Sequence, residues 1–186
     1  MVFHCVIGGI HQMRFCYGHR RFTLYPQSVD SWNLNPDNYT EDFLKRSKDI
    51  GFDALEVGVE VLDQLGTEQK VKDFSSKLNA AGLAVGCVRA GGTLHDAQNG
   101  PQNRVKLTNA IKYAGWAGAE VVNGAISAPA RHPGHPPGSL PGSQSGWPVS
   151  QDASRDAMLY VYDELTTVFQ NACLMASNVG TDITVE

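Results

Sequence analysis

The chain has 186 residues, of which 42% are hydrophobic, so it can bury one core and falls within the range of a single domain. Its 15 lysine and arginine residues against 19 acidic residues give a formal net charge of −4, and no basic run offers a surface to nucleic acid. No apolar stretch reaches the roughly 18 residues that a membrane span needs, and the first residues lack an export signal, so we expect a cytoplasmic protein.

The four cysteines lie far apart in the sequence, at Cys5, Cys16, Cys87 and Cys173. Neither the close pairs of a zinc site nor the density of a disulfide scaffold is present. Cys87 and Cys173 fall in apolar surroundings, so we expect them to be small buried hydrophobic side chains.

Residues 1–20 show no helical or strand periodicity, and we leave them unassigned, as an N-terminal extension that is disordered or that precedes a second start at Met13. From Arg21 onward, strands and helices are predicted to alternate. The expected strands are at residues 21–25, 54–62, 83–88, 121–126 and 182–186, and the expected helices at 37–50, 67–81, 103–117 and 153–178. Such alternation is typical of parallel strands with right-handed crossovers.

Each predicted helix from the first to the last is followed by a glycine and then by a strand, at Gly51, Gly82, Gly118 and Gly180. A glycine past the end of a helix can take the left-handed conformation that closes off the last carbonyls. Four repeats of this arrangement predict one repeated βα unit.

The helix periodicity is clearest in the fourth predicted helix, where an apolar stripe is expected to face the sheet. Its members are Met158, Val161, Leu165, Val168, Phe169, Ala172 and Ala176. The first predicted helix opens with Asn35 as a candidate cap and Pro36 at its first position.

Two architectures fit an alternating α/β chain, the doubly wound sheet and the (β/α)8 barrel. In the last strand Ile183 and Val185 point to one face, whereas Asp182, Thr184 and Glu186 point to the other. A polar inner face favours the barrel, and no glycine-rich nucleotide-binding loop follows the first strand. At about 40 residues per unit, residues 21–186 are expected to form four βα units plus a fifth strand of a partial (β/α)8 barrel, about half of one.

Two charged residues are candidates for a pocket at the carboxyl ends of the strands, where such barrels keep their sites. Alternation places Glu56 on the inner face, where a lone carboxylate either binds substrate or makes a structural hydrogen bond or salt bridge. Arg89 follows the third strand together with Gly91 and Gly92, which either let a polyol or phosphate approach the backbone or simply form a turn.

The loops after the third and fourth strands hold the remaining candidates. His95, His132 and His135 lie on this face, but Pro133 and Gly134 rule out a helical metal pair between the last two. We expect that these histidines either reach substrate or metal or are solvated. In the long loop at residues 125–151, Trp147 either packs against a sugar ring or anchors the loop.

Several of these segments together resemble the xylose isomerase-like barrels grouped as sugar phosphate isomerases and epimerases. The segments are "GFDALEV", "GLAVGCVRAGG", the long Gly/Pro loop and "GTDITVE", and they cover most of residues 21–186. The resemblance implies that Glu186, at the end of the fifth strand, binds a divalent metal ion (Mn²⁺, Mg²⁺, Co²⁺ or Zn²⁺) and acts in catalysis, with further ligands coming from later strands.

The implied reaction is proton transfer next to a carbonyl, through an enediolate of a sugar or polyol substrate. Because the remaining ligands lie past Glu186, we expect this chain to be the N-terminal half of a truncated barrel and inactive alone. The resemblance also allows an inosose dehydratase-like enzyme, whereas the acidic balance disfavours the DNA-repair endonucleases of similar fold. The alternative from another class is a non-catalytic half-barrel that associates through its exposed edges with a partner chain or a second copy.

Overall fold

The computed structural model describes residues 2–4, 13–18, 35–92, 94, 99–124 and 151–185, and of residues 2–4, 13 and 151–164 the backbone alone. Six strands form one sheet, with neighbours in chain order. Their bounds are β1 (Val2–His4), β2 (Met13–Tyr17), β3 (Ala54–Gly58), β4 (Ala84–Ala90), β5 (Val121–Gly124) and β6 (Asp182–Val185). β1 pairs with β2 in antiparallel fashion, and β2 to β6 are all parallel.

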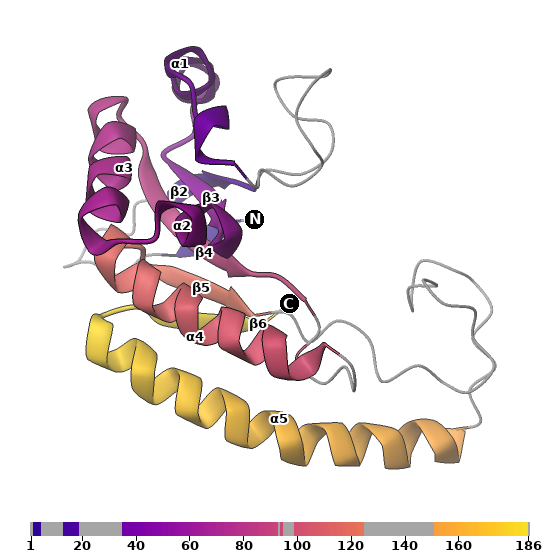
Figure 1. Ribbon diagram of the computed structural model, residues 1–186. Coiled ribbons are helices and arrows are strands. Elements are labelled where there is room, and N and C mark those ends of the chain that lie inside the picture. Colours follow the sequence, from indigo (N-terminus) through magenta and orange to yellow (C-terminus); the bar gives the residue numbers. More distant parts are fainter. Residues whose placement is uncertain are drawn as a thin grey trace.

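Helices connect the parallel strands and lie beside one another in Figure 1. They are η1 (Pro36–Asn38) and α1 (Glu41–Ile50) before β3, α2 (Val59–Leu65) and α3 (Glu68–Ala80) before β4, α4 (Gly100–Ala117) before β5, and α5 (Gln151–Val179) before β6. Among the described residues, no helix is both long and apolar enough to cross a bilayer.

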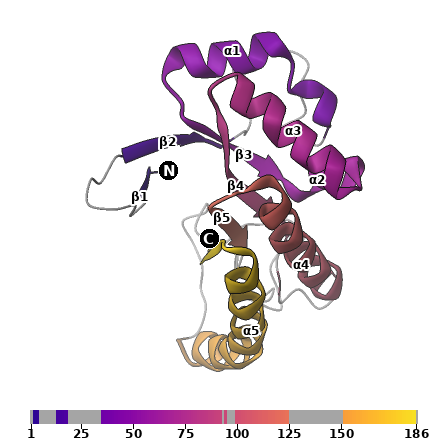
Figure 2. The ribbon, with the colours of Figure 1, turned by 90° about the vertical axis from the view of Figure 1, so that its left-hand side faces the viewer.

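The five parallel strands form a curled half-barrel, and the helices follow the curl on its outer side (Figure 2). The predicted fold class, a partial (β/α)8 barrel of four βα units plus a fifth strand, is confirmed. Helices lie between consecutive parallel strands because a parallel strand cannot return to its neighbour without a crossover.

The core lies between the outer face of the sheet and the helices. Leu55 and Val57 of β3, Val88 of β4 and Val122 of β5 are at most 1% exposed. Burying a side chain of this size stabilises the fold by about 1.5–3 kcal/mol. The predicted stripe of α5 is confirmed where its side chains are described, with Leu165, Ala172 and Ala176 buried and Val168 and Phe169 packed against the core.

The predicted glycine junctions are confirmed. Gly51, Gly82, Gly118 and Gly180 all have positive φ angles, between 68° and 106°. Gly51 shows the arrangement clearly, because its N–H donates to the carbonyl of Lys48, and the chain then turns into β3. An L-side chain at such a backbone angle would be strained, which explains why a glycine follows each helix.

The strand expected at residues 54–62 ends earlier than predicted. β3 stops at Gly58, and residues 59–65 form α2, in which Val59, Val61 and Leu62 are buried. The alternation of valines suggested a continued strand. The extended backbone of Gly58 instead starts a helix, whose Glu60 and other polar residues face α4.

The helix expected at residues 37–50 is split in two. Asn35 does cap a helix, since its side chain accepts a hydrogen bond from the N–H of Asp37, but that helix is the short η1. α1 begins at Glu41, with the Thr40 hydroxyl accepting from the N–H of Phe43. Between them Tyr39 is 1% exposed and packs edge-on against Phe43, and this packing interrupts the helix.

Two further expectations differ from the structure. The first parallel strand that is described is β2, within the segment that sequence analysis leaves unassigned, where Cys16 and Tyr17 pair with β3. The strand expected at residues 21–25 lies outside the described residues. Cys173 was expected to be buried but is exposed, because it lies beside the α5 stripe, whereas Cys87 is buried as predicted.

Candidate active site

The register of the sheet brings polar side chains into one row at the carboxyl ends of the strands. Arg89 pairs with Gly58 on one side and with Asn123 on the other, and Asn123 pairs with Thr184. Paired residues of neighbouring strands point to the same face. Leu55, Val88 and Val122 alternate with these positions and face the helices, so the row of Arg89, Asn123 and Thr184 lies on the inner face, as does Glu56.

Glu56 and Arg89 form an ion pair on this inner face. The Nη1 atom of Arg89 lies 3.9 Å from Oε1 of Glu56. The Arg89 side chain is 17% exposed and the Glu56 side chain 10%. Glu56 pairs in register with Cys87, one step nearer the amino end than the row. The structure therefore places both predicted side chains together on the inner face. Their role in substrate binding stays a prediction.

Two glycines make room for this ion pair. A Cβ atom added to Gly18, after β2, would lie 3.7 Å from both carboxylate oxygens of Glu56. Gly58 leaves the position beside Arg89 in the row without a side chain. The Glu56 carboxylate therefore has space to extend toward Arg89, in the direction of the carboxyl ends of the strands.

Two thiols lie close to this carboxylate. Burial raises the pKa of the Cys16 thiol to about 12, and the negative charge of Glu56 raises it further. Burial likewise raises the pKa of the Cys87 thiol, with Glu56 again contributing, while a hydrogen bond from the Asn123 backbone opposes the rise. Both sulfurs are therefore neutral thiols at physiological pH and not activated nucleophiles.

Asn123 and Thr184 were not singled out as site residues by the sequence analysis. Asn123 is 2% exposed although it is polar, and Thr184 is half-buried with its hydroxyl 3.5 Å from the carbonyl of Val122. For Thr184 a usable signal exists, because it lies on the polar side of the alternation in the last strand. Asn123 shares its face with Val121, so the alternation of "VVNG" alone does not indicate it.

Gly91 and Gly92, after β4, make a turn. Gly92 has a φ of +98°, and an added Cβ would come within 2.3 Å of the Asn103 side-chain oxygen. The Asn103 amide of α4 thus occupies the space at Gly92, which favours the turn-forming interpretation over ligand approach to the backbone at this residue. Arg104 of α4 donates a hydrogen bond from Nε to the carbonyl of Leu94 at 3.1 Å.

The other predicted site residues, His95, His132, His135, Trp147 and Glu186, lie outside the described residues. In the part of the chain that is described, no three His, Cys, Asp or Glu side chains gather to hold a metal ion. Of the described carboxylates on this face, Glu56 already has Arg89 as its counter-charge. The described residues alone therefore do not fit a divalent ion, which requires about six oxygen ligands.

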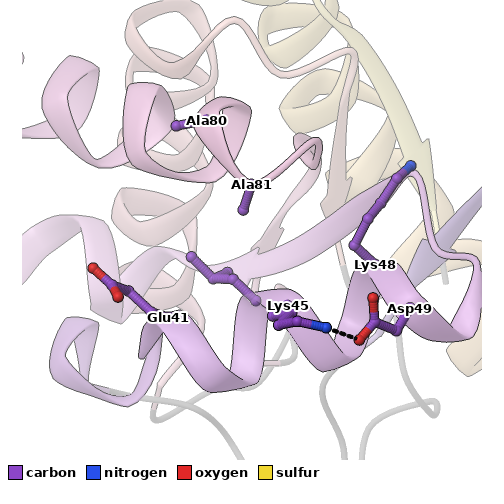
Figure 3. A pocket seen from close by; sticks show the side chains of 7 residues that line it. Glu41, Lys45, Lys48, Asp49, Ala80 and Ala81 are labelled. Carbon is purple, nitrogen blue, oxygen red and sulfur yellow. Dashed lines mark hydrogen bonds and ion pairs between the residues drawn. The ribbon is translucent and has the colours of Figure 1, made fainter.

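Two grooves lie in the outer helical layer, away from this row. One, of about 420 Å³, lies between α1 and the end of α3, and Figure 3 shows Glu41, Lys45, Lys48 and Asp49 of α1 lining it together with Ala80 and Ala81. The other, of about 450 Å³, lies between the ends of α4 and α5. Since both include the carboxyl ends of helices, they open near the amino ends of the strands, the end that in barrels serves stability.

Comparison of the chain with known proteins adds the fold family. No protein-family model matches the sequence, and a search of curated proteins gives no significant match. Solved structures do match: 3-keto-D-glucoside 4-epimerase from E. coli has a TM-score of 0.54 at 18% identity, over 94% of this chain and 56% of that one. The chain has the fold of half a xylose isomerase-like barrel.

Two further matches agree with this assignment. A xylose isomerase domain protein from Planctomyces limnophilus has a TM-score of 0.54 at 17% identity, over 76% of this chain and 48% of that one. D-psicose 3-epimerase from Clostridium cellulolyticum H10, in a structure with D-tagatose, has a TM-score of 0.52 at 12% identity, over 92% and 51%. The chain thus spans about half the length of these xylose isomerase-like structures, and at such identities the likeness concerns the fold.

Proposed function

We propose that this half-barrel belongs to a sugar or sugar-phosphate isomerase or epimerase. The supporting observation is the half-barrel fold itself, which matches solved epimerases and carries a hydrogen-bonding row at the carboxyl ends of its strands. Barrels of this kind keep their sites at that end. The proposed substrate is a small sugar or polyol, and the proposed location is the cytoplasm.

The proposed reaction is proton transfer at a carbon next to a carbonyl. In this half, Arg89 and Asn123 would donate hydrogen bonds to substrate oxygens, while Glu56 would accept from a hydroxyl. We further propose that Glu186 contributes to a divalent metal site, together with groups from outside the described residues. Such an ion would polarise the carbonyl when bound. Because the described residues do not form its site, we derive no step through it.

The decisive experiment is solvent-deuterium exchange in ketoses. The 186-residue chain, and the longer protein if its reading frame continues, would be incubated in D₂O with ketohexoses, their phosphates and inososes, with each of the four divalent metals added in turn. Proton transfer at the carbon next to the carbonyl replaces the carbon-bound proton of the substrate by deuterium, which NMR detects before net conversion is visible. Loss of water from an inosose would instead favour the dehydratase alternative.

Glu186→Gln and Glu56→Gln serve as matched variants that keep side-chain size and remove charge. Glu186→Gln is expected to abolish exchange, and Glu56→Gln to weaken it mainly through substrate binding. Exchange in none of the substrates, with the metal-supplemented longer protein, would refute the proposed function.

The alternative, a non-catalytic half-barrel that associates with a partner or a second copy, has one observation in its favour. Within the described sheet β6 is an edge strand, where Val185 is 49% exposed, and Leu174 of α5 is 68% exposed. Exposed edges and apolar residues of this kind promote pairing with another chain. Light scattering coupled to size exclusion distinguishes the two cases, because a defined dimer without deuterium exchange would favour association alone.

A further inference from the structure

The row at the carboxyl ends of the strands contains both hydrogen-bond donors and acceptors, on adjacent strands. Arg89 offers a guanidinium, Asn123 an amide and Thr184 a hydroxyl, on β4, β5 and β6 in register. Neighbouring strands lie about 4.8 Å apart, so the three side chains are spread over two such spacings. Such a row can contact several oxygens of one extended polyol.

Among the described residues of the inner face at and next to the row, the charge of Arg89 is balanced and a further carboxylate lies nearby. Arg89 is matched by Glu56 at 3.9 Å, and the inner-face residue of β6 one step below the row is the exposed Asp182. Asn123 and Thr184 are uncharged. A phosphate placed against Arg89 would therefore also meet the field of at least one carboxylate, whose repulsion extends over several ångströms in a partly buried site.

Five other cations among the described residues have acidic partners outside the row. Arg14 pairs with Glu120 at the amino ends of the strands, and Lys106 pairs with Glu60 in the helical layer at 3.0 Å. Lys48, Lys45 and Lys72 pair with Asp53, Asp49 and Glu68. These five do not contribute a net positive charge to the row.

We infer that this row binds the uncharged, hydroxyl-bearing part of the substrate, and that Glu56 excludes phosphate by compensating the charge of Arg89. The inference rests on the proposed function and narrows it: any phosphate group of the substrate binds outside this row. Glu56 is then a specificity-determining residue, and Arg89 is a donor that binds neutral oxygens as long as Glu56 is ionised beside it.

The test uses inorganic phosphate as the probe, so that it does not depend on which sugar is the substrate. Binding to the full chain is measured by isothermal titration, and the Arg89 side-chain Nε–H signal is followed in ¹⁵N–¹H spectra. Wild type is expected to show neither heat nor a shift of this signal. Glu56→Gln is expected to bind phosphate at least about tenfold more tightly than wild type, because the repulsive charge is gone and Arg89 remains.

Two control variants isolate the cause. Glu68→Gln removes the same charge from the exposed pair with Lys72 and should leave phosphate binding at the wild-type level. Glu56→Gln combined with Arg89→Gln should lose the binding that the single variant gains. If that double variant does not fold, the shift of the Arg89 signal in Glu56→Gln alone decides the point.

Phosphate binding by wild type with a shift of the Arg89 signal would overturn the inference, and so would Glu56→Gln without any gain. Either result could coexist with deuterium exchange in a ketose, in which case the isomerase or epimerase function stands and only the exclusion of phosphate falls. Conversely, a protein inactive on every ketose that still gained phosphate binding in Glu56→Gln would refute the function, while the charge compensation would hold.

Discussion

Replacing Gly86 by alanine tests the packing of the half-barrel interior. Gly86 lies at the register shift between β3 and β4, where Leu55 pairs with Val85 but Glu56 pairs with Cys87. A Cβ atom there would lie 2.7 Å from the Cβ of Ala54 and 3.1 Å from the sulfur of Cys16, whereas ordinary contacts are 3.4–4 Å. The Ala54 Cβ cannot rotate away, so the strands themselves must move.

The expected cost follows from two opposing effects. Overpacking a tight site destabilises by about 1–3 kcal/mol. Replacing glycine by alanine also restricts the unfolded chain, which offsets roughly 0.4–1 kcal/mol. We therefore expect Gly86→Ala to lower the free energy of unfolding by about 1–2 kcal/mol, or about 2–4 °C in Tm for each kcal/mol.

Urea unfolding followed by circular dichroism measures this change, and Ala54→Gly provides the internal test. In the double variant the collision with Ala54 is removed, so the two substitutions should couple by about 1 kcal/mol or more. Gly124→Ala is the matched control, because its Cβ would lie 3.3 Å from an edge atom of the Phe169 ring, which can shift, and it should cost less. Additive effects of Gly86→Ala and Ala54→Gly would refute the register and close contact described here.

Three further predictions concern caps, core and pH. Thr40→Ala should cost about 1 kcal/mol of stability in urea unfolding by removing the cap of α1, with Thr40→Ser restoring most of it. Leu62→Ala should cost about 2–5 kcal/mol, whereas Leu174→Ala, at a side chain 68% exposed, should change stability little. Burial and the hydrogen bond to Asp63 raise the pKa of Tyr113 to about 12, so the neutral phenol favours the folded state, and stability should fall as pH rises above 10. A wild type that loses stability no more steeply than Tyr113→Phe between pH 10 and 12 would contradict this assignment.

The repeated architecture could be predicted because its signals are local. A glycine that must take a positive φ, such as Gly118, and an apolar stripe such as that of α5 depend on backbone geometry and periodicity within one segment. The end of β3 could not be predicted in the same way. Val57, Val59 and Val61 alternate as in a strand, but Val59 and Val61 belong to the helix α2. They are buried because α2 packs against β3 and α4, a tertiary arrangement that the alternation does not encode.

The candidate site could be predicted only in part for a similar reason. Glu56 and Arg89 could be identified from the sequence, because a charged side chain on the inner face of a barrel requires a partner or a function. The structure pairs the two side chains. Asn123 is a neutral residue in a short strand, and its place in the row depends on the register of β5 against β4. Which side chains share a row is a property of strand pairing, so a single strand read alone does not reveal it.

The two ends of the parallel strands carry different kinds of interaction, and this separates stability from binding. At the amino ends, Asp53 and Phe15 exchange hydrogen bonds of 2.8 Å and 3.1 Å, and Arg14 of β2 reaches Glu120 beside β5. The first contact joins the neighbouring strands β2 and β3, whereas the second links β2 to the start of β5, which is not adjacent to it, and so helps to hold the curl. At the carboxyl ends the glycines leave space around the Glu56 and Arg89 pair instead. Because these contacts lie at the far end of the strands, we expect the conservative substitution Glu56→Gln to keep the fold, which makes the charge test on Glu56 interpretable.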